Sequence, residues 1–339
     1  MAEKTFLKKI ITTTLVLGIC SYAKPIDFTY NTYKIENEKQ KLFVSKNNKG
    51  ILYAGSFDFG RCENKKDGII QPLKNGELKC KNISLKVRNA EIIGILKNGK
   101  FQHLNLKLEQ SFKTQEQVAN FTYTGKSNNS ATITTKFQCS KDPTIQKILE
   151  KMYGIKFNCK NGISEINKIA KKSLLKDTES IDTILSSSAF EEQSGDFLYY
   201  FDEEFLSFDT YNYIYTGGAH GNHTRSGITI SKNGDIIPLA DILTPSNKPL
   251  KDFLWKEYQK FAKEMRSEPL IKYEEFNISN SILLDYGEVL FLYQPYELMP
   301  YSYGVITLKI PFEAFLEFTK TKNSPLELIK KQIPKNKLN

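Results

Sequence analysis

The pattern of apolar and polar residues divides the 339-residue chain into a strand-rich first part and a mixed second part. Apolar and polar residues alternate over 83–87, which is typical of a half-buried strand. Asn98-Gly99 lies between two strand-like runs and predicts a tight hairpin. Asp142, a proline and an apolar run of helical spacing that stops at Gly154 predict a helix. We therefore predict a mostly-β domain over residues 24–163.

The second part combines aromatic, strand-like stretches with one amphipathic helix. Apolar residues recur at helical spacing from Leu250 to Arg266, which predicts the helix. Strand-like stretches precede it between 197 and 215 and follow it between 281 and 310. This order predicts an α+β domain over residues 175–318, an antiparallel sheet with one main helix on a face. The polar, helix-prone segment 161–194 is interpreted as a junction without a strong core.

Residues 1–23 have the features of a secretory signal peptide. Three lysines precede the apolar run Ile10–Cys20, and small residues lead to a cleavage site after Ala23. The run is too short to span a bilayer, and no later stretch reaches that length. A lipoprotein anchor at Cys20 and an uncleaved anchor are alternatives, although Ile19 stands where lipidation favours a small residue. We predict a periplasmic or secreted protein.

Cleavage after Ala23 would leave four cysteines. An even number of cysteines in an exported chain indicates disulfides, and four cysteines allow three pairings. We favour the two pairings that close short local loops. A zinc site is the alternative, but the chain has no C-x-x-C spacing. The predicted disulfides are Cys62–Cys80 and Cys139–Cys159.

The formal charge of +10 is concentrated in the leader and in the Lys-rich tail, residues 319–339, which is predicted to be disordered. The region between them is nearly balanced. Arginine, the side chain that most often contacts bases, occurs only at positions 61, 88, 225 and 266. We therefore exclude nucleic acid as a partner.

Two motifs carry a resemblance to a known family. The first is Tyr213–Asn222, with the sequence YIYTGGAHGN, and the second is Phe291–Tyr301, with the sequence FLYQPYELMPY. Over residues 180–318 the chain resembles the extracellular domain of unknown function 3298, which the lysozyme-sensing anti-sigma factor and some peptidoglycan deacetylases share. The resemblance implies a binding or sensing module outside the cytoplasm, and it does not by itself imply an enzyme.

The chemistry of the first motif centres on a glycine-rich turn. Gly217, Gly218 and Gly221 are expected to supply unusual backbone angles, and His220 to hydrogen-bond across the turn. Such a turn can also present backbone N–H groups to an anion or a glycan hydroxyl. Tyrosines of both motifs offer a stacking surface for sugar rings or a protein. The candidate binding residues are Tyr215, Gly217, Gly218, His220, Asn222, Tyr296 and Tyr301.

Catalytic chemistry has weaker support in the sequence. His220 and His223 form an H-x-x-H pair, but the glycines oppose a helix there and no glutamate lies between them. The sequence contains no arguable Ser-His-Asp or Cys-His set, and we predict no cofactor. We favour an exported binding or sensing protein whose partner is an envelope glycan or an exported protein. A lysozyme-type inhibitor or sensor, and a metal-dependent envelope hydrolase or deacetylase using His220 and His223, remain alternatives.

Overall fold

The structure is a computed structural model. The predicted signal peptide and almost all of the predicted tail lie outside the described residues, and the two predictions remain untested. The described residues are 24–36, 40–66, 69–243, 247–319 and 327.

The strands are β1 (Ile26–Ile35), β2 (Lys41–Asn47), β3 (Gly50–Ser56), β4 (Gly60–Glu63), β5 (Lys65–Lys66), β6 (Ile69–Ile70), β7 (Gly76–Lys79), β8 (Ser84–Arg88), β9 (Glu91–Lys97), β10 (Lys100–His103), β11 (Leu106–Thr124), β12 (Ser130–Cys139), β13 (Phe190–Phe201), β14 (Phe205–Tyr215), β15 (Asn222–Ser231), β16 (Ile236–Ile237), β17 (Ile282–Asp285), β18 (Glu288–Tyr293) and β19 (Ile306–Pro311). The helices are α1 (Pro143–Tyr153), α2 (Gly162–Leu174), η1 (Leu175–Asp177), α3 (Thr178–Ser187), α4 (Lys248–Glu264), η2 (Tyr301–Tyr303) and α5 (Phe312–Glu317).

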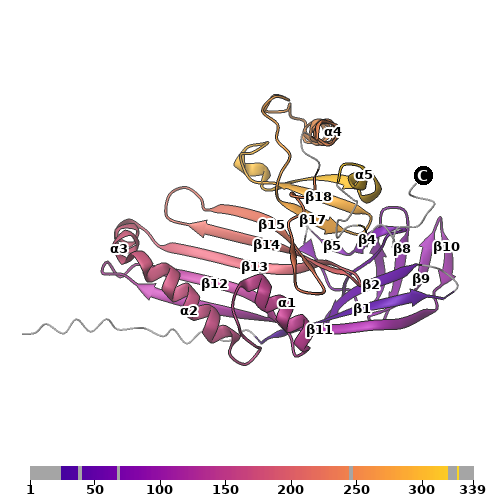
Figure 1. The fold of residues 1–339 in the computed structure, drawn as a ribbon, viewed down its shortest axis with the longest axis horizontal. Coiled ribbons are helices and arrows are strands. Elements are labelled where there is room, and N and C mark those ends of the chain that lie inside the picture. The colour runs from indigo at the N-terminus through magenta and orange to yellow at the C-terminus, as the bar shows by residue number, and fades with distance from the viewer. Residues whose placement is uncertain (1–23, 37–39, 67–68, 244–246, 320–326, 328–339) are drawn as a thin grey trace, which may run out of the picture.

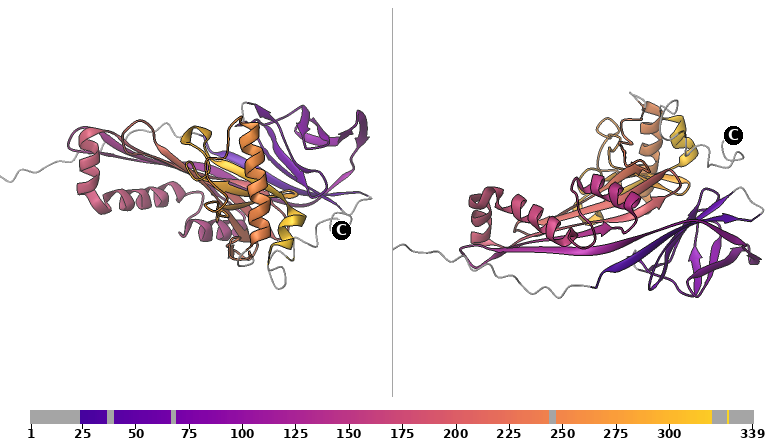
Figure 2. Two further views of the ribbon diagram at one scale, coloured as in Figure 1. Left: turned by 90° about the horizontal axis from the view of Figure 1, so that it is seen from above. Right: turned by 60° about the horizontal axis from the view of Figure 1, so that its bottom comes forward.

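Within the described residues, fourteen strands form one sheet in the order β10-β9-β8-β7-β4-β3-β2-β1-β11-β12-β13-β14-β15-β16. Figure 2 shows the long strands as one twisted surface, with the N-terminal strands curled at one end. Its neighbouring strands are antiparallel except β12 and β13, which run parallel with Ala131 opposite Phe190. A parallel pair needs a long crossover, and the segment that contains α1, α2 and α3 provides it.

Local signals in the first part are confirmed. Asn98 and Gly99 both have positive φ, 49° and 75°, as a two-residue hairpin turn between β9 and β10 requires. Helix α1 begins after Asp142, whose side chain accepts hydrogen bonds from the backbone N–H groups of Thr144 and Ile145. It ends at Gly154 in the left-handed conformation.

Both predicted disulfide pairings are present. Cys62 of β4 bonds to Cys80 beside β7, and Cys139 of β12 bonds to Cys159 ahead of α2. The two bonds therefore fasten different parts of the large sheet.

The segment interpreted as a junction has more core than its composition suggests. Helix α2 packs on β11 and β12 and buries Ile166, Ala170 and Leu174 at four-residue spacing. Ala131 and Ile133 of β12 belong to the same apolar cluster. The helices of residues 161–194 therefore pack on the large sheet and share its apolar core, and the sheet continues with β13 after them. The division into domains at 24–163 and 175–318 stays a prediction.

A second sheet, β17-β18-β19, packs on strands β13, β14 and β15 of the large sheet, and α4 and α5 contact it (Figure 1). Leu283, Leu290 and Leu292 form one cluster with Tyr199 of β13. Helix α4 is the longest helix among the described residues and buries Leu254 among other apolar side chains. This confirms an α+β fold of largely antiparallel sheets with one main amphipathic helix.

None of the helices within the described residues is both long enough and apolar enough to cross a membrane.

Candidate functional site

The glycine-rich turn joins β14 to β15. Gly217 and Gly218 have φ of 99° and 95°, as the sequence predicts. The prediction is wrong for Gly221, whose φ is not positive. A Cβ atom at this position would lie 2.4 Å from the ring of Tyr213, so its role is close packing. The Tyr215 hydroxyl donates to the carbonyl of Gly218 at 3.2 Å and closes the turn.

The second motif forms a turn of its own, Gln294–Glu297. The backbone N–H of Glu297 donates to the carbonyl of Gln294 at 3.1 Å. Tyr296 occupies the position after the proline with φ of 73°, where a side chain is strained and glycine is usual. Its side chain is 65% exposed. The strained turn therefore holds a large aromatic ring in solvent.

Hydrogen bonds hold this turn against the hairpin formed by β14 and β15. The Gln294 side chain accepts from the backbone N–H of Arg225 at 2.9 Å and donates to its carbonyl at 2.8 Å. The Ser281 hydroxyl donates to the same carbonyl at 3.2 Å. The Arg225 side chain forms a bidentate ion pair with Asp209 on β14. Burial by itself lowers the pKa of Arg225, but the contacts with Asp209 raise the pKa by more than burial lowers it. The pKa therefore lies above its ordinary value, and the guanidinium stays charged.

The two motifs meet at Tyr301. Its hydroxyl donates to the carbonyl of Gly221 at 2.7 Å. The His220 ring stacks on the Tyr301 ring with centroids 3.9 Å apart, and the His223 and Tyr296 rings lie 5.2 and 5.9 Å away. We call His220, His223, Tyr296 and Tyr301 the His–Tyr surface.

The contacts of the two histidines assign their tautomers. His220 Nδ1 lies 2.9 Å from the Gly221 carbonyl, which only accepts, so this nitrogen carries hydrogen. His223 Nδ1 lies 3.3 Å from the Tyr301 hydroxyl, whose proton is directed at Gly221, so it donates as well. Two imidazoles are thus oriented by their neighbours.

A cavity of about 530 Å³ is lined in part by Gln294 and Glu297, the two ends of the turn that carries Tyr296, but none of the four residues of the His–Tyr surface lines it. Tyr293 also lines the cavity, and burial raises the pKa of its hydroxyl, which stays protonated and donates to the Asn277 carbonyl. The polar side chains lining the cavity are those of Glu275, Asn277, Ser279, Asn280, Ser281, Tyr293, Gln294 and Glu297.

The predicted binding residues do not all belong to this assembly. His220, Tyr296 and Tyr301 come together although 76 residues separate the first two in sequence. Tyr215 instead closes its own turn, and Asn222 lies exposed opposite Ile214 at the start of β15. Their roles in binding stay predictions. Sequence reasoning missed the positioning role of Gln294, and its only signal was membership of the second motif.

The described residues contain no group of three His, Cys, Asp or Glu side chains that could hold a metal ion.

The fold and this surface define a class: a disulfide-containing α+β protein with an exposed aromatic site at the meeting point of two motifs. Residues 240–313 match the family described as protein of unknown function DUF3298. Residues 98–223 match the family described as deacetylase PdaC. His220 and His223 thus lie in one matched segment, and Tyr296 and Tyr301 lie in the other. The sequence resemblance is assigned to residues 180–318. Of this range, residues 180–223 fall in the PdaC match and residues 240–313 in the DUF3298 match.

Two solved structures of the DUF3298 family also match. The one from Bacteroides fragilis is 18% identical, covers 61% of this chain and 93% of its own, and has a TM-score of 0.46. The one from Pseudomonas aeruginosa is 18% identical, covers 62% of this chain and 94% of its own, and has a TM-score of 0.40. None of the curated proteins compared with the chain matches it.

Proposed function

We propose that the protein is an exported binding or sensing protein and that its His–Tyr surface binds an envelope glycan. The observation that carries the proposal is the Tyr296 ring, held in solvent by a strained turn whose two end residues line a cavity rich in hydroxyls, amides and carboxylates. Sugar rings present apolar faces that stack on aromatic rings and hydroxyls that bond to such polar groups. Residues with strained backbone conformations cluster at functional sites.

Export is the second part of the proposal. Two disulfides are typical of proteins that fold in an oxidising compartment, and the leader with its cleavage site after Ala23 would deliver the chain there. Mass spectrometry of the protein from the periplasm or medium should give a chain that begins at Lys24. A full-length chain with free thiols in the cytoplasm would refute export.

Glycan binding is tested by calorimetric titration of the chain from Lys24 with oligosaccharides of alternating N-acetylglucosamine and N-acetylmuramic acid. Replacing Tyr296 with alanine should weaken binding at least tenfold, or about 1.4 kcal/mol, because a stacked ring is lost. Phe101→Ala is the matched control, because Phe101 is also an exposed aromatic residue but lies on β10. Equal affinity of both variants and the parent chain would refute the glycan site.

An exported protein is the second candidate partner, because exposed tyrosines are also typical of energetically dominant positions in protein interfaces. The lysozyme-type inhibitor belongs to this class. A lytic assay with the chain in excess tests it, and inhibition lost in Tyr296→Ala but kept in Phe101→Ala would favour the protein partner over the glycan. Deacetylation, which the name of the matched family suggests, would need a catalytic group beyond His220 and His223.

A further inference from the structure

A second cavity, of about 680 Å³, lies between two parts of the chain that are distant in sequence. One wall belongs to β4 and its neighbouring turns, within residues 57–82. The other wall belongs largely to β17, β18, β19 and α5, within residues 285–313. None of its lining residues belongs to the His–Tyr surface or to the first cavity. The first wall lies outside both segments that match family models.

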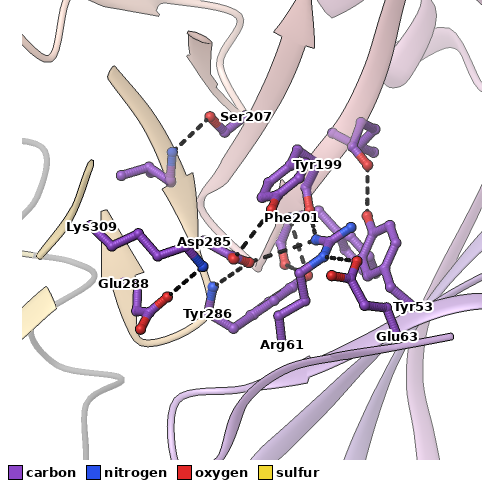
Figure 3. A network of polar contacts seen from close by, with 12 residues as sticks. Tyr53, Arg61, Glu63, Tyr199, Phe201, Ser207, Asp285, Tyr286, Glu288 and Lys309 are labelled. Atoms are coloured by element: carbon purple, nitrogen blue, oxygen red, sulfur yellow. Dashed lines mark hydrogen bonds and ion pairs between the residues drawn. The ribbon is translucent and has the colours of Figure 1, made fainter. Parts of the chain in front are cut away.

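Arg61 is the central residue of the first wall (Figure 3). Its side chain is only 6% exposed, and its guanidinium lies 3.9 Å from the ring centres of both Tyr53 and Tyr199. Nε is 3.1 Å from a Glu63 oxygen, and Nη1 donates to the Tyr199 carbonyl at 2.6 Å and lies 3.6 Å from Asp285. Two of its three nitrogens therefore have partners.

The third nitrogen has none. Arg61 Nη2 is buried without a hydrogen-bond partner among the described residues. A buried guanidinium nitrogen without an acceptor is energetically unfavourable. Buried polar groups in native proteins almost always have a partner, either protein, water or ligand. Arg61 lines the cavity, and an acceptor bound there would reach this buried nitrogen after a small shift of the side chains around it.

The two walls differ in the sign of their charge. The first wall carries three basic side chains and two acidic ones, and the second carries one basic and three acidic. Lys309 on the second wall is paired with Glu288 at 3.0 Å, as the close view shows (Figure 3). The charged lining residues are Asp58, Arg61, Glu63, Lys65 and Lys81 on the first wall and Asp285, Glu288, Lys309 and Glu313 on the second.

We propose that this cavity binds a small zwitterion, an amino acid or short peptide with free termini. Its carboxylate faces Arg61 and Lys81, and its ammonium group faces Glu288 and Glu313. A carboxylate is the best acceptor for a guanidinium donor, and an ammonium group complements the acidic wall. The volume lies in the range of small-molecule sites. The aromatic side chains of Phe59 and Tyr199 offer apolar contact to the ligand's own side chain.

The test is a calorimetric titration of the chain from Lys24 with alanyl-alanine and two blocked forms of it. Acetylation of the amino end removes the ammonium group, and amidation of the carboxyl end removes the carboxylate. We expect saturable binding of the free dipeptide and at least tenfold weaker binding of each blocked form. No saturable binding of the free dipeptide, or equal binding of either blocked form, would overturn the proposal.

Surface variants keep the test independent of the folding role of Arg61. Lys81→Gln and Glu313→Gln each remove one lining charge and should weaken dipeptide binding at least fivefold. Lys260→Gln, on the exposed side of α4, is the matched control and should leave binding unchanged. Tyr296→Ala should also leave it unchanged, which separates this cavity from the proposed glycan site. Unaltered binding in both Lys81→Gln and Glu313→Gln would refute the assignment.

Discussion

Asp196 makes the stability of this protein depend on pH in an unusual direction. It lies on β13, and one carboxylate oxygen accepts a hydrogen bond from the Tyr153 hydroxyl of α1. The other oxygen is buried without a hydrogen-bond partner among the described residues. Burial raises the pKa of Asp196 to about 7, the Tyr153 hydrogen bond lowers it in part, and nearby Glu116 raises it again.

The sign of the effect follows from proton binding. The unfolded chain releases the Asp196 proton near its ordinary pKa of 3.8, whereas the folded chain keeps it until about pH 7. Between these values the folded state binds more protons, so the free energy of unfolding falls as pH rises. One pKa unit corresponds to about 1.4 kcal/mol, so the full effect is at most about 4 kcal/mol. Asp202 and Asp285, whose pKa values burial raises to about 6, act in the same direction.

Asp196→Asn isolates this contribution, because asparagine is neutral at every pH. We expect the variant to be more stable than the parent chain by more than 1 kcal/mol at pH 8 and equal to it near pH 4. Urea unfolding followed by the fluorescence of Trp255, the single tryptophan, measures both differences. Asp241→Asn, at an exposed aspartate, is the control. An identical stability difference at pH 4 and pH 8 would refute the reasoning.

Three further predictions concern the backbone and the disulfides. Replacing Cys139 and Cys159 by serine should lower the free energy of unfolding by about 3 kcal/mol, because a 20-residue loop is released, and a loss below 1 kcal/mol in urea unfolding would contradict this. Gly227→Ala should lower it by about 1–3 kcal/mol or prevent folding, since its Cβ would lie 1.9 Å from the Ile282 carbonyl oxygen; an unchanged melting temperature would refute the close approach. Tyr296→Gly should raise the free energy of unfolding by about 1 kcal/mol and Tyr296→Ala should not, because only glycine adopts the positive φ at this position without strain. Equal melting temperatures of the two variants in calorimetric scans would contradict this.

Features set by adjacent residues could be predicted from the sequence. The hairpin at Asn98-Gly99 and the helix from Asp142 to Gly154 depend on turn and cap chemistry within a few residues. The disulfide pairing followed from a preference for short loops, which the geometry of the sheet satisfies.

Features that depend on distant pairing could not be predicted in this way. The parallel contact of β12 with β13 spans three helices, and no local pattern encodes which strand follows a crossover. The sequence identified both motifs of the His–Tyr surface, but only the tertiary structure shows that Tyr301 reaches Gly221. Arg61 gave no signal, because its environment is assembled from β3, β4, β13 and β17.

The ion pair between Arg61 and Asp285 is better explained by how it selects the arrangement of the two cavity walls than by a net gain in the stability of the fold. Removing a guanidinium and a carboxylate from water is unfavourable by several kcal/mol per ion, and their attraction offsets this only when partners and geometry are right. Arg61 and Asp285 come from opposite walls of the second cavity, so Asp285 would lose its Arg61 counter-charge if the walls met in another register, whereas Arg61 would keep Glu63 of its own strand. The pair therefore disfavours alternative arrangements of the first wall against the β17-β18-β19 sheet. Arg61 and Asp285 also line the cavity. The contacts that select this arrangement therefore hold the two walls in place before a ligand binds. A preorganised site of this kind loses less entropy on binding.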